Sequence, residues 1–286
     1  MTTHSWLFVP ADSEKKLSKT HNLSARAFIL DLEDSVALAN KAVARQRAAD
    51  FLRQSGLPRE RLWIRINPLD GPYVDEDLAA VMPAAPGGIV LPKARSPQDV
   101  EELSGRLERL EDEHGIEPGS TRILPIVTET PGALFSLGGY AACGPRLAGL
   151  TWGAEDLGSA IGATATRDLG GEWTPPFRLV RNLCLFAAHA AGVPAIDTVF
   201  VNFADFAELD DECEEARRDG FSGKLAIHPA QVDIINRAFR PSEEELERAR
   251  KIVDLFKAHP DAAVLEFEGA MVDLPHLKQA QRILDL

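Results

Sequence analysis

Short apolar runs rich in β-branched residues recur along the chain and alternate with longer stretches that have helical spacing. About eight such runs are present, and most are continuously apolar rather than alternating. Continuous apolar runs are typical of parallel strands that are buried on both faces. The pattern therefore predicts a parallel sheet whose strands are separated by helices. The predicted strands begin at Trp6, Ala27, Leu62, Gly88, Ile123, Leu147, Thr198 and Lys224.

The stretches between the runs predict amphipathic helices. Residues 96–114 open with Ser-Pro and carry apolar residues at helical spacing from Val100 to Leu110. Residues 35–54 are rich in alanine and residues 204–218 are strongly acidic, and we expect both to be helical. Eight strand–helix repeats in 286 residues fit an α/β fold of the (β/α)8 TIM-barrel type, and a doubly wound open sheet is the alternative.

Polar residues collect directly after the predicted strands, which favours the barrel. In a barrel the carboxyl ends of all strands meet in one place, whereas an open sheet spreads them along an edge. We therefore expect these residues to surround a single pocket. They are residues 10–12, 31–34, 65–68, 92–94, Glu129, 155–156, Asn202 and 228–229.

A C-terminal segment follows the eighth predicted strand, and this segment is not needed to close a barrel. We expect residues 1–240 to form the barrel domain and residues 241–286 to form a helical C-terminal extension that packs on the barrel or acts as a lid. Ser242 and Glu245 have the spacing of a capping box at a helix start. The expected elements are a helix at 242–257, a break at 258–261, an extended piece at 263–269 and a helix at 274–286.

Composition narrows the class of protein. The net charge of -13 and the lack of a basic stripe argue against a nucleic-acid partner. The three cysteines are scattered without a CxxC pair, which favours free thiols in a reducing compartment. The first ten residues do not resemble a signal peptide, and no apolar run approaches the ~20 residues that span a membrane. We therefore expect a cytoplasmic protein without a membrane partner.

Two acidic residues follow neighbouring apolar runs at the points where the predicted strands end. Glu129 comes after the run that begins at Ile123, and Asp156 follows the run that begins at Leu147. A Mg²⁺ ion prefers a few carboxylate oxygens and keeps sites for water or substrate, so this pair predicts a metal site. Glu155 competes with Asp156 as a ligand, and the alternative is that each acid belongs to the first turn of a helix.

A second acidic cluster, Asp31, Glu33 and Asp34, follows the second apolar run. Buried carboxylates this dense need a cation or a network of donors, and they could hold metal-bound waters. The alternative is a solvated loop that caps a helix starting at Ser35. Arg65 lies inside another apolar run, where a charge is costly unless it is paired. It suits a substrate carboxylate or carbonyl, and the alternative is an internal ion pair.

Taken in order, seven segments of the chain resemble the family of citrate lyase β subunits and malyl-CoA or citramalyl-CoA lyases, within the HpcH/HpaI aldolase superfamily. They extend from the first predicted strand to the last, and the ordered set is far more specific than any one of them. The segments are residues 7–10, 31–35, 65–67, 91–93, 129–130, 153–157 and 227–229.

The resemblance implies a TIM barrel in which Glu129 and Asp156 hold Mg²⁺, which selects Asp156 over Glu155. It also implies that Arg65 contacts the bound oxo acid or the thioester. Residues 269–275 resemble the C-terminal segment of the stand-alone lyases, in which the aspartate, here Asp273, enters the active site of a neighbouring subunit. The alternative is that Asp273 only caps the last helix.

The activity that the resemblance implies is cleavage or formation of a carbon–carbon bond next to a CoA thioester, with a small 2-oxo acid as the other partner. A homotrimer or hexamer with exchanged lids is expected. Lys19, Arg26 and Lys93 are candidate phosphate contacts. The alternatives are a citryl-thioester lyase subunit of a citrate lyase complex, malyl-CoA hydrolysis or malate synthesis, and a non-catalytic barrel.

Overall fold

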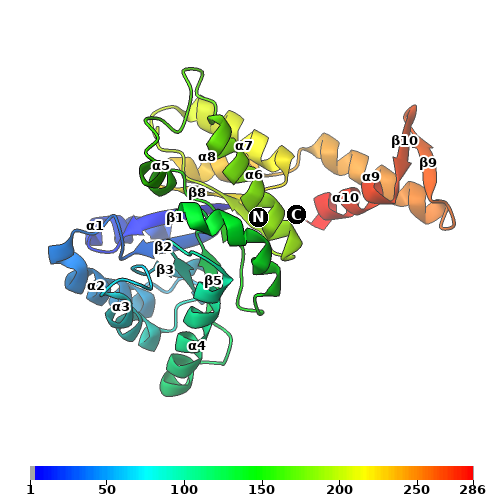
Figure 1. Cartoon of the computed structure of the whole chain (residues 1–286). Coiled ribbons are helices and arrows are strands. Elements are labelled where there is room, and N and C mark those ends of the chain that lie inside the picture. Colours follow the sequence, from blue (N-terminus) through cyan, green and yellow to red (C-terminus); the bar gives the residue numbers. More distant parts are fainter. Residues whose placement is uncertain (1–3, 286) are drawn as a thin grey trace.

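Eight parallel strands form one sheet that closes on itself and is surrounded by helices. The computed structural model describes residues 4–285. The strand order is β5-β4-β3-β2-β1-β8-β7-β6, and the bridges Ile123–Leu147 and Ile126–Thr151 join the two edges. The predicted (β/α)8 barrel is therefore confirmed (Figure 1). The strands are β1 (Ser5–Pro10), β2 (Ala27–Asp31), β3 (Leu62–Arg65), β4 (Gly88–Leu91), β5 (Arg122–Pro125), β6 (Leu150–Thr151), β7 (Ala195–Asp197) and β8 (Gly223–Ala226).

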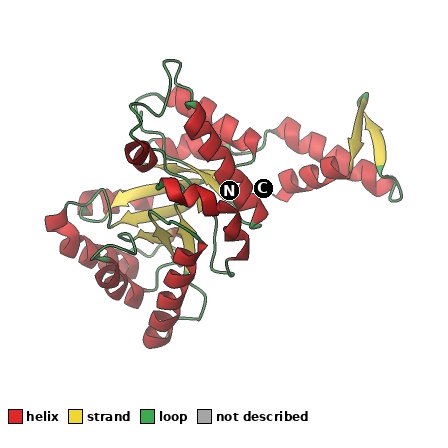
Figure 2. Ribbon diagram, in the orientation of Figure 1, coloured by secondary structure: helices red, strands yellow, loops and turns green. Residues whose placement is uncertain are grey.

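Helices cover the outside of the barrel (Figure 2). The α-helices between strands are α1 (Glu14–Ser18), α2 (Lys41–Gln54), α3 (Val74–Val81), α4 (Pro97–His114), α5 (Glu155–Ile161), α6 (Pro175–Ala190), α7 (Phe206–Asp219) and α8 (Gln231–Ala238). Short 3₁₀ helices are η1 (Lys19–Asn22), η2 (Leu38–Asn40), η3 (Arg59–Arg61), η4 (Met82–Ala84) and η5 (Pro131–Ala142). The predicted helices at 96–114 and 204–218 correspond to α4 and α7.

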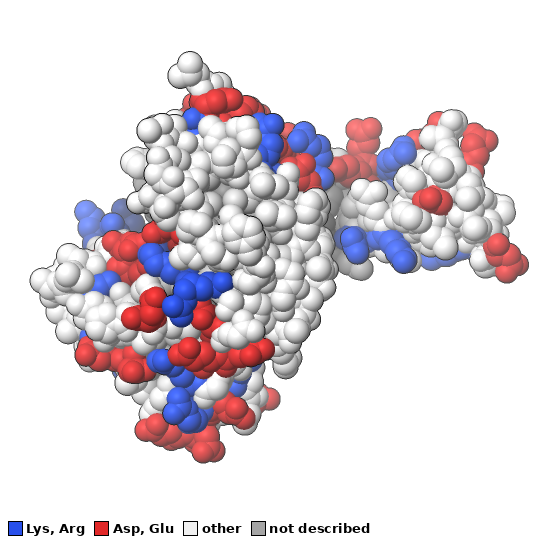
Figure 3. All heavy atoms as spheres, in the orientation of Figure 1, with Lys and Arg blue, Asp and Glu red and all other residues white. Residues whose placement is uncertain are grey.

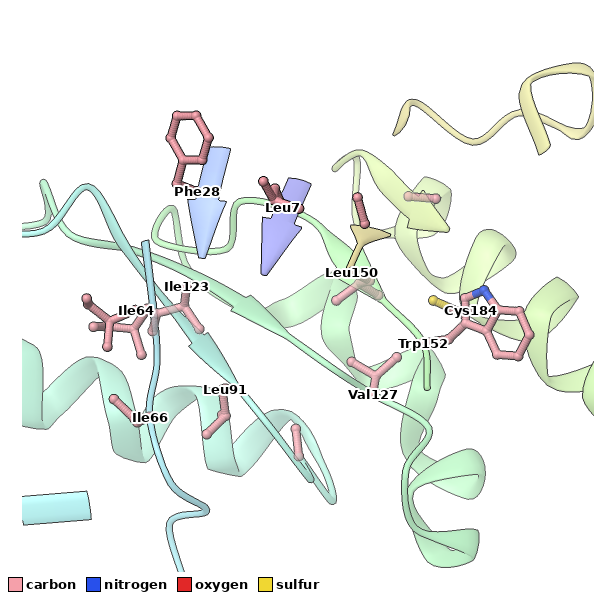
Figure 4. Close-up of a cluster of buried hydrophobic side chains, with 14 of the residues drawn as sticks. Leu7, Phe28, Ile64, Ile66, Leu91, Ile123, Val127, Leu150, Trp152 and Cys184 are labelled. Atoms are coloured by element: carbon pink, nitrogen blue, oxygen red, sulfur yellow. The ribbon is translucent and has the colours of Figure 1, made fainter. Parts of the chain in front are cut away.

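The core has two layers, inside the barrel and between the barrel and its helices. The inner layer contains Trp6 and Trp63, whose rings meet edge to face at 5.0 Å. The outer layer is larger, and Figure 4 shows a part of it that includes Phe28, Ile64 and Trp152. Strands buried on both faces explain why the sequence shows continuous apolar runs.

The seventh strand was predicted too late in the chain. The run that begins at Thr198 is a loop, and β7 consists of the three residues before it. Asp197 broke the apolar pattern, but its carboxylate is buried against the Lys224 ammonium at 2.7 Å. A buried cation partner therefore allows an acidic residue such as Asp197 to lie in a strand, although the apolar pattern alone excludes it from the strand.

The helix predicted from Ser35 starts later, at Lys41. The segment before it consists of a turn and the short helix η2, and the buried Lys41 ammonium binds two of its carbonyl groups. Its Nζ atom donates to the carbonyl oxygens of Leu32 and Glu33 at 2.6 and 2.8 Å. The acidic cluster is therefore part of a loop held by Lys41, and the idea that it caps a helix beginning at Ser35 is wrong.

After the barrel, a segment projects away from it (Figure 1). It consists of α9 (Glu243–Ala258), the hairpin β9 (Val264–Phe267) and β10 (Ala270–Asp273), and α10 (Leu274–Asp285). We call it the C-terminal arm. It has its own apolar cluster, in which Phe256 of α9 packs with Val272 and Ala280. The predicted capping box at Ser242 and Glu245 is present.

The second strand of the arm's hairpin was not predicted from the sequence. Its two-residue turn, Glu268 and Gly269, has positive φ at both positions, which is the geometry of a type I′ hairpin turn. Among residues 4–285, none of the helices is both long and apolar enough to cross a membrane.

Candidate active site

A pocket of about 550 Å³ lies at the carboxyl ends of the barrel strands. Its lining comes from residues of β1, β2, β3 and β8 and from the segments after β1, β2, β5, β6, β7 and β8, as a barrel mouth requires. Most of the acidic residues expected around a single pocket are here. Asp31, Asp34, Arg65, Glu129 and Asp156 all line it. Asp31 and Arg65 are the last residues of β2 and β3, Asp34 and Glu129 lie in the loops that follow β2 and β5, and Asp156 lies in the first turn of α5.

Glu129 is held in place by the loop that follows β6. A Cβ atom on Gly153 would lie 2.8 Å from Glu129 Cγ, so only glycine leaves room for this side chain. Thr128 ties the two loops together, because its Oγ1 donates to the Gly153 carbonyl and accepts from the Gly153 N–H, at 3.2 and 3.0 Å. The two predicted metal ligands thus belong to loops that are joined directly.

Asp156 begins α5 with Glu155, and both line the pocket. The Asp156 carboxylate lies 3.3 Å from the Lys93 ammonium. Glu155 has no ion pair among the described residues. The geometry therefore brings Asp156 into the charged cluster of the pocket, whereas Glu155 only borders it.

Arg65 and Asp31 are register partners on the adjacent strands β3 and β2. The guanidinium donates to both carboxylate oxygens, from Nε at 2.7 Å and from Nη2 at 2.6 Å. Its third nitrogen, Nη1, is 2.9 Å from Glu33. Two carboxylates and the Phe8 ring, 4.6 Å away, thus fix the plane of the guanidinium at the pocket wall.

Lys93 belongs to the charged cluster of this site, and the sequence did not predict this role. Its φ of 51° is left-handed, a conformation that costs a non-glycine residue roughly 1–2 kcal/mol. This backbone directs the Lys93 N–H at Glu129 Oε2, at 2.5 Å, while the ammonium reaches Glu33 at 2.5 Å and Asp34 at 3.3 Å. In the sequence Lys93 stood out only by its position after a predicted strand, by the resemblance of residues 91–93 to the family, and as a candidate phosphate contact, and none of these indicated contacts to carboxylates.

Burial and charge act differently on the carboxyl groups of the pocket. Burial raises the pKa of Glu129 to about 8, and the nearby Asp156 and Glu33 charges add to the rise, whereas the N–H of Lys93 opposes it. Burial also raises the pKa of Glu33, against the opposing effects of Arg65 and Lys93. For Asp31 the effect of burial is outweighed by the Arg65 guanidinium, so its pKa lies below the ordinary value.

The pocket therefore holds more acid than base. Its charged cluster contains Asp31, Glu33, Asp34, Glu129 and Asp156 with the cations Arg65 and Lys93, and Glu155, Lys16 and Lys19 line the pocket beside it. Within residues 4–285, no cationic side chain forms an ion pair with Glu129. A divalent cation fits this imbalance, because Mg²⁺ takes one or two protein carboxylates and completes its shell with water or substrate. No set of three or more His, Cys, Asp or Glu side chains in the same residues forms a closed metal cage.

Asp273 is not in this pocket. It ends β10 in the C-terminal arm, and its carboxylate contacts His276 Nδ1 at 2.5 Å. Of the candidate phosphate contacts, Lys19 lines the pocket, whereas Arg26 lies in a separate cavity at the opposite end of the barrel. Lys93 is occupied by carboxylates. The interpretation of Arg26 as a contact to a ligand of this pocket is therefore wrong.

Fold and pocket together define a barrel protein with an acid-rich site at the carboxyl ends of its strands. The model of the HpcH/HpaI aldolase/citrate lyase family matches residues 4–229, and a model for carbon–carbon bond lyases of the TIM-barrel fold matches residues 183–286. The chain therefore belongs to the HpcH/HpaI aldolase/citrate lyase family.

Three known proteins illustrate the range of the family. The mitochondrial citramalyl-CoA lyase of Rattus norvegicus is 32% identical, over 98% of this chain and 84% of its own. The citrate lyase subunit beta of Escherichia coli is 32% identical, over 99% of this chain and 92% of its own. The CitE protein of Mycobacterium tuberculosis, solved with magnesium, acetoacetate and coenzyme A, has a TM-score of 0.81 at 33% identity, covering 99% and 97% of the chains.

Proposed function

We propose that this protein is a Mg²⁺-dependent carbon–carbon lyase that cleaves or forms a 3-hydroxyacyl-CoA thioester such as malyl-CoA or citramalyl-CoA. The products of cleavage are acetyl-CoA and a 2-oxo acid. The observation that carries the proposal is the joined pair of loops that brings Glu129 and Asp156 to one acid-rich pocket. Relatives that are citrate lyase β subunits and citramalyl-CoA lyases support this reaction class.

In this proposal Glu129 and Asp156 hold the metal, and Asp31, Glu33 and Asp34 surround it. Bound Mg²⁺ supplies Lewis-acid stabilisation to the oxygens of the 2-oxo acid. Glu33 and Asp34 share the Lys93 ammonium, so they remain available to hydrogen-bond water beside the metal.

Arg65 contributes a fixed positive charge to the wall of the pocket. Because Asp31 and Glu33 fix its guanidinium through all three nitrogens, it meets the substrate without having to reorganise, and its remaining charge stabilises the negative charge that develops on the oxo acid or the thioester. In the cleavage direction the substrate hydroxyl loses its proton, the carbon–carbon bond breaks, and its electron pair forms the enolate of acetyl-CoA.

Protonation of that enolate carbon is assigned to Asp273, supplied by the C-terminal arm of another subunit. The arm projects from its own barrel (Figure 1), and Asp273 does not line the pocket of its own chain. We treat residues 241–286 as a lid that closes over a neighbouring pocket and excludes water, in a homotrimer or a hexamer.

Exposed apolar surface supports this self-association. Figure 3 shows a broad face almost without charged side chains over η5 and α6. Phe135 of η5 is 93% exposed and Phe186 of α6 is 64% exposed. Met271 and Leu274, on either side of Asp273, are exposed as well. Apolar patches of this kind mark protein contacts, and those on the arm flank the residue that it would deliver.

The decisive experiment is a Mg²⁺-dependent assay of the purified chain on malyl-CoA, citramalyl-CoA and citryl-CoA, with each oxo acid identified directly. We expect cleavage of at least one free CoA ester that is lost on chelation of Mg²⁺. Hydrolysis without carbon–carbon cleavage would assign a thioesterase instead. No turnover on the whole panel would contradict the proposal and favour a non-catalytic barrel.

A citryl-thioester lyase subunit of a citrate lyase complex is the second candidate. Residues 269–275 resemble the C-terminal segment of the stand-alone enzymes. The Escherichia coli β subunit matches 99% of this chain, arm included, so the segment does not separate the two functions. Activity of the isolated chain on free CoA esters, as opposed to carrier-bound citryl thioesters only, distinguishes them.

Asp273→Asn should leave binding of acetyl-CoA nearly unchanged while slowing exchange of its methyl protons at least about 100-fold, because the carboxylate is the proposed proton carrier. Asp261→Asn, an exposed substitution on the same arm, is the matched control. Co-expressed Asp273→Asn and Glu129→Gln chains should regain part of the activity, since one supplies the barrel and the other the arm. Recovery would fail if each arm served its own barrel.

A further inference from the structure

A second cavity lies at the amino-terminal end of the barrel, opposite the acid-rich pocket. It has a volume of about 510 Å³, and segments leading into all eight strands contribute to its lining. The edge-to-face pair Trp6 and Trp63 forms its apolar floor, and Gly88 makes room for it because a Cβ atom there would lie 2.2 Å from the Trp63 ring. Nothing in the proposed lyase reaction uses this end of the barrel.

Three arginines line this cavity: Arg26, Arg59 and Arg122. None of them forms an ion pair within the described chain. Arg59 and Arg122 instead donate to neutral groups, such as the Pro86 and Leu147 carbonyl oxygens, at 3.1 and 3.0 Å. These hydrogen bonds orient the guanidinium groups but leave their charge uncompensated.

The remaining groups do not neutralise this charge. Glu60 is the single carboxylate in the cavity lining, and it has no ion pair among residues 4–285. His4 also lines the cavity, and burial lowers its pKa, as do the Arg240 and Arg26 charges. His4 is therefore neutral near pH 7. A net positive cavity in a chain of net charge -13 stands out from the rest of the molecule.

From these observations we infer that the amino-terminal cavity binds a small phosphate-bearing anion. Guanidinium groups match phosphate oxygens in geometry and charge. The Arg26 side chain makes no hydrogen bond within the described chain, and Nη1 of Arg122 also has no partner there, so both have donors to offer. The apolar floor raises the strength of these charge interactions, as low-dielectric walls do in other anion-binding clefts. The volume exceeds that of a phosphate ion and admits an attached organic group.

Tryptophan fluorescence offers a direct test, because two of the four tryptophans form the cavity floor. Inorganic phosphate should change the emission of the whole protein in a saturable way, and chloride at equal ionic strength should not. Arg26→Glu should weaken the phosphate affinity about tenfold or more, since it removes a donor and adds repulsion. Because Arg26 is exposed and its side chain makes no hydrogen bond or ion pair within the described chain, this variant should keep the thermal unfolding midpoint of the parent in phosphate-free buffer.

Two matched charge reversals locate the response. Arg109→Glu, on the exposed face of α4, should leave phosphate affinity within about twofold of the parent. Lys19→Glu changes the lining of the acid-rich pocket and should also have little effect. A response that disappears in Lys19→Glu and persists in Arg26→Glu would place the phosphate at the other end of the barrel and overturn the proposal, as would the lack of any saturable response.

Adenosine monophosphate distinguishes the two sources of the phosphate group. Binding at least about tenfold tighter than inorganic phosphate, and lost in Arg26→Glu, would assign a nucleotide that also occupies the rest of the cavity. Equal affinities would assign free phosphate. Tight binding of the nucleotide that Arg26→Glu does not affect would refute the site.

Discussion

The barrel contains two buried charge clusters whose balance differs. Around Lys224, between β7, β8 and α7, carboxylates and cations are equal in number: Asp197, Glu212 and Asp219 face Lys224, Arg167 and Arg181. In the pocket at the strand ends, five carboxylates face Arg65 and Lys93. The first cluster is balanced by its own cations, and the second has an excess of acid that a bound divalent cation would offset.

This difference separates charged groups that stabilise the fold from charged groups that remain available to bind a ligand. A buried carboxylate is tolerated when a cation and hydrogen bonds compensate it, as Lys224 compensates Asp197. The pKa of Asp197 is accordingly lowered, because Lys224 and Arg181 outweigh the effect of burial. Glu129 lacks such a cation, and its pKa rises with burial. Acid excess therefore marks the functional cluster better than acid content does.

Lys224→Met should produce the largest loss of stability. It leaves Asp197 and Glu212 buried without their shared ammonium, which lies 2.7 and 2.6 Å from them. Removing one partner of a buried ion pair typically costs about 3–5 kcal/mol. Urea unfolding at pH 7 measures this loss, and Mg²⁺ should not restore it. A cost below about 1 kcal/mol would show that this cluster does not hold the fold together.

Glu129→Gln should have the opposite effect to Lys224→Met, because it should weaken Mg²⁺ binding without destabilising the fold. Loss of one of the two proposed ligand carboxylates should weaken Mg²⁺ binding at least about 100-fold by calorimetry. Without metal at pH 7 the free energy of unfolding should not fall, because the cluster loses a buried group whose raised pKa disfavours its ionised form, and the glutamine oxygen still accepts from the Lys93 N–H. Unchanged Mg²⁺ affinity would remove Glu129 as a ligand, and a Lys224-like loss of stability would erase the contrast between the clusters.

The pH dependence should reveal the same excess acid. In the metal-free protein Glu129 has a pKa of about 8, against 4.5 when unfolded, so the folded state binds its proton more tightly. Its contribution to stability is therefore present at low pH and is lost as pH rises from about 4.5 to about 8. Unfolding of the parent and of Glu129→Gln, compared at about pH 5.5 and 8.5, isolates this contribution. Saturating Mg²⁺ should reverse the decline, and equal pH profiles would contradict the raised pKa.

The fold and the acidic pocket at the strand ends could be predicted from the sequence, whereas the balanced cluster around Lys224 could not. Each strand is short and apolar, so its end is visible, and Glu129 and Asp156 could be placed at one rim. Local patterns do not reveal which strands are neighbours in the barrel. The pairing of Asp31 with Arg65 depends on the register of β2 against β3, and it appeared only as one of two alternatives.

Other residues were hidden because their role depends on geometry that composition does not encode. Lys93 joins the pocket through a left-handed backbone at φ 51°. Lys224 opens an apolar run, and its fully buried ammonium is explained by Asp197 and Glu212, of which Asp197 lies just before the run predicted as the seventh strand. Whether a buried charge is compensated is a tertiary property, so the balance of the two clusters had to come from the structure.

Trp152→Phe should have the smallest effect on Mg²⁺ binding, and it tests whether the two clusters are independent. Trp152 lines the pocket, while its Nε1–H donates to Asp197 Oδ1 at 2.7 Å. Loss of a hydrogen bond to a charged group costs about 1.5–3 kcal/mol. Trp173→Phe is the matched control, because Trp173 Nε1 has no partner in the described chain, and the difference between the two variants isolates the hydrogen bond.

If the balanced cluster only supports the fold, Trp152→Phe should shift Mg²⁺ affinity by less than about threefold, because Asp197 keeps Lys224 and the loop with Asp156 keeps its tie to Thr128. A loss of more than tenfold in Mg²⁺ affinity, absent from Trp173→Phe, would mean that Asp197 positions the metal loop through the indole. The balanced cluster would then belong to the site, and the distinction between charges that fold and charges that bind would apply to individual residues rather than to whole clusters.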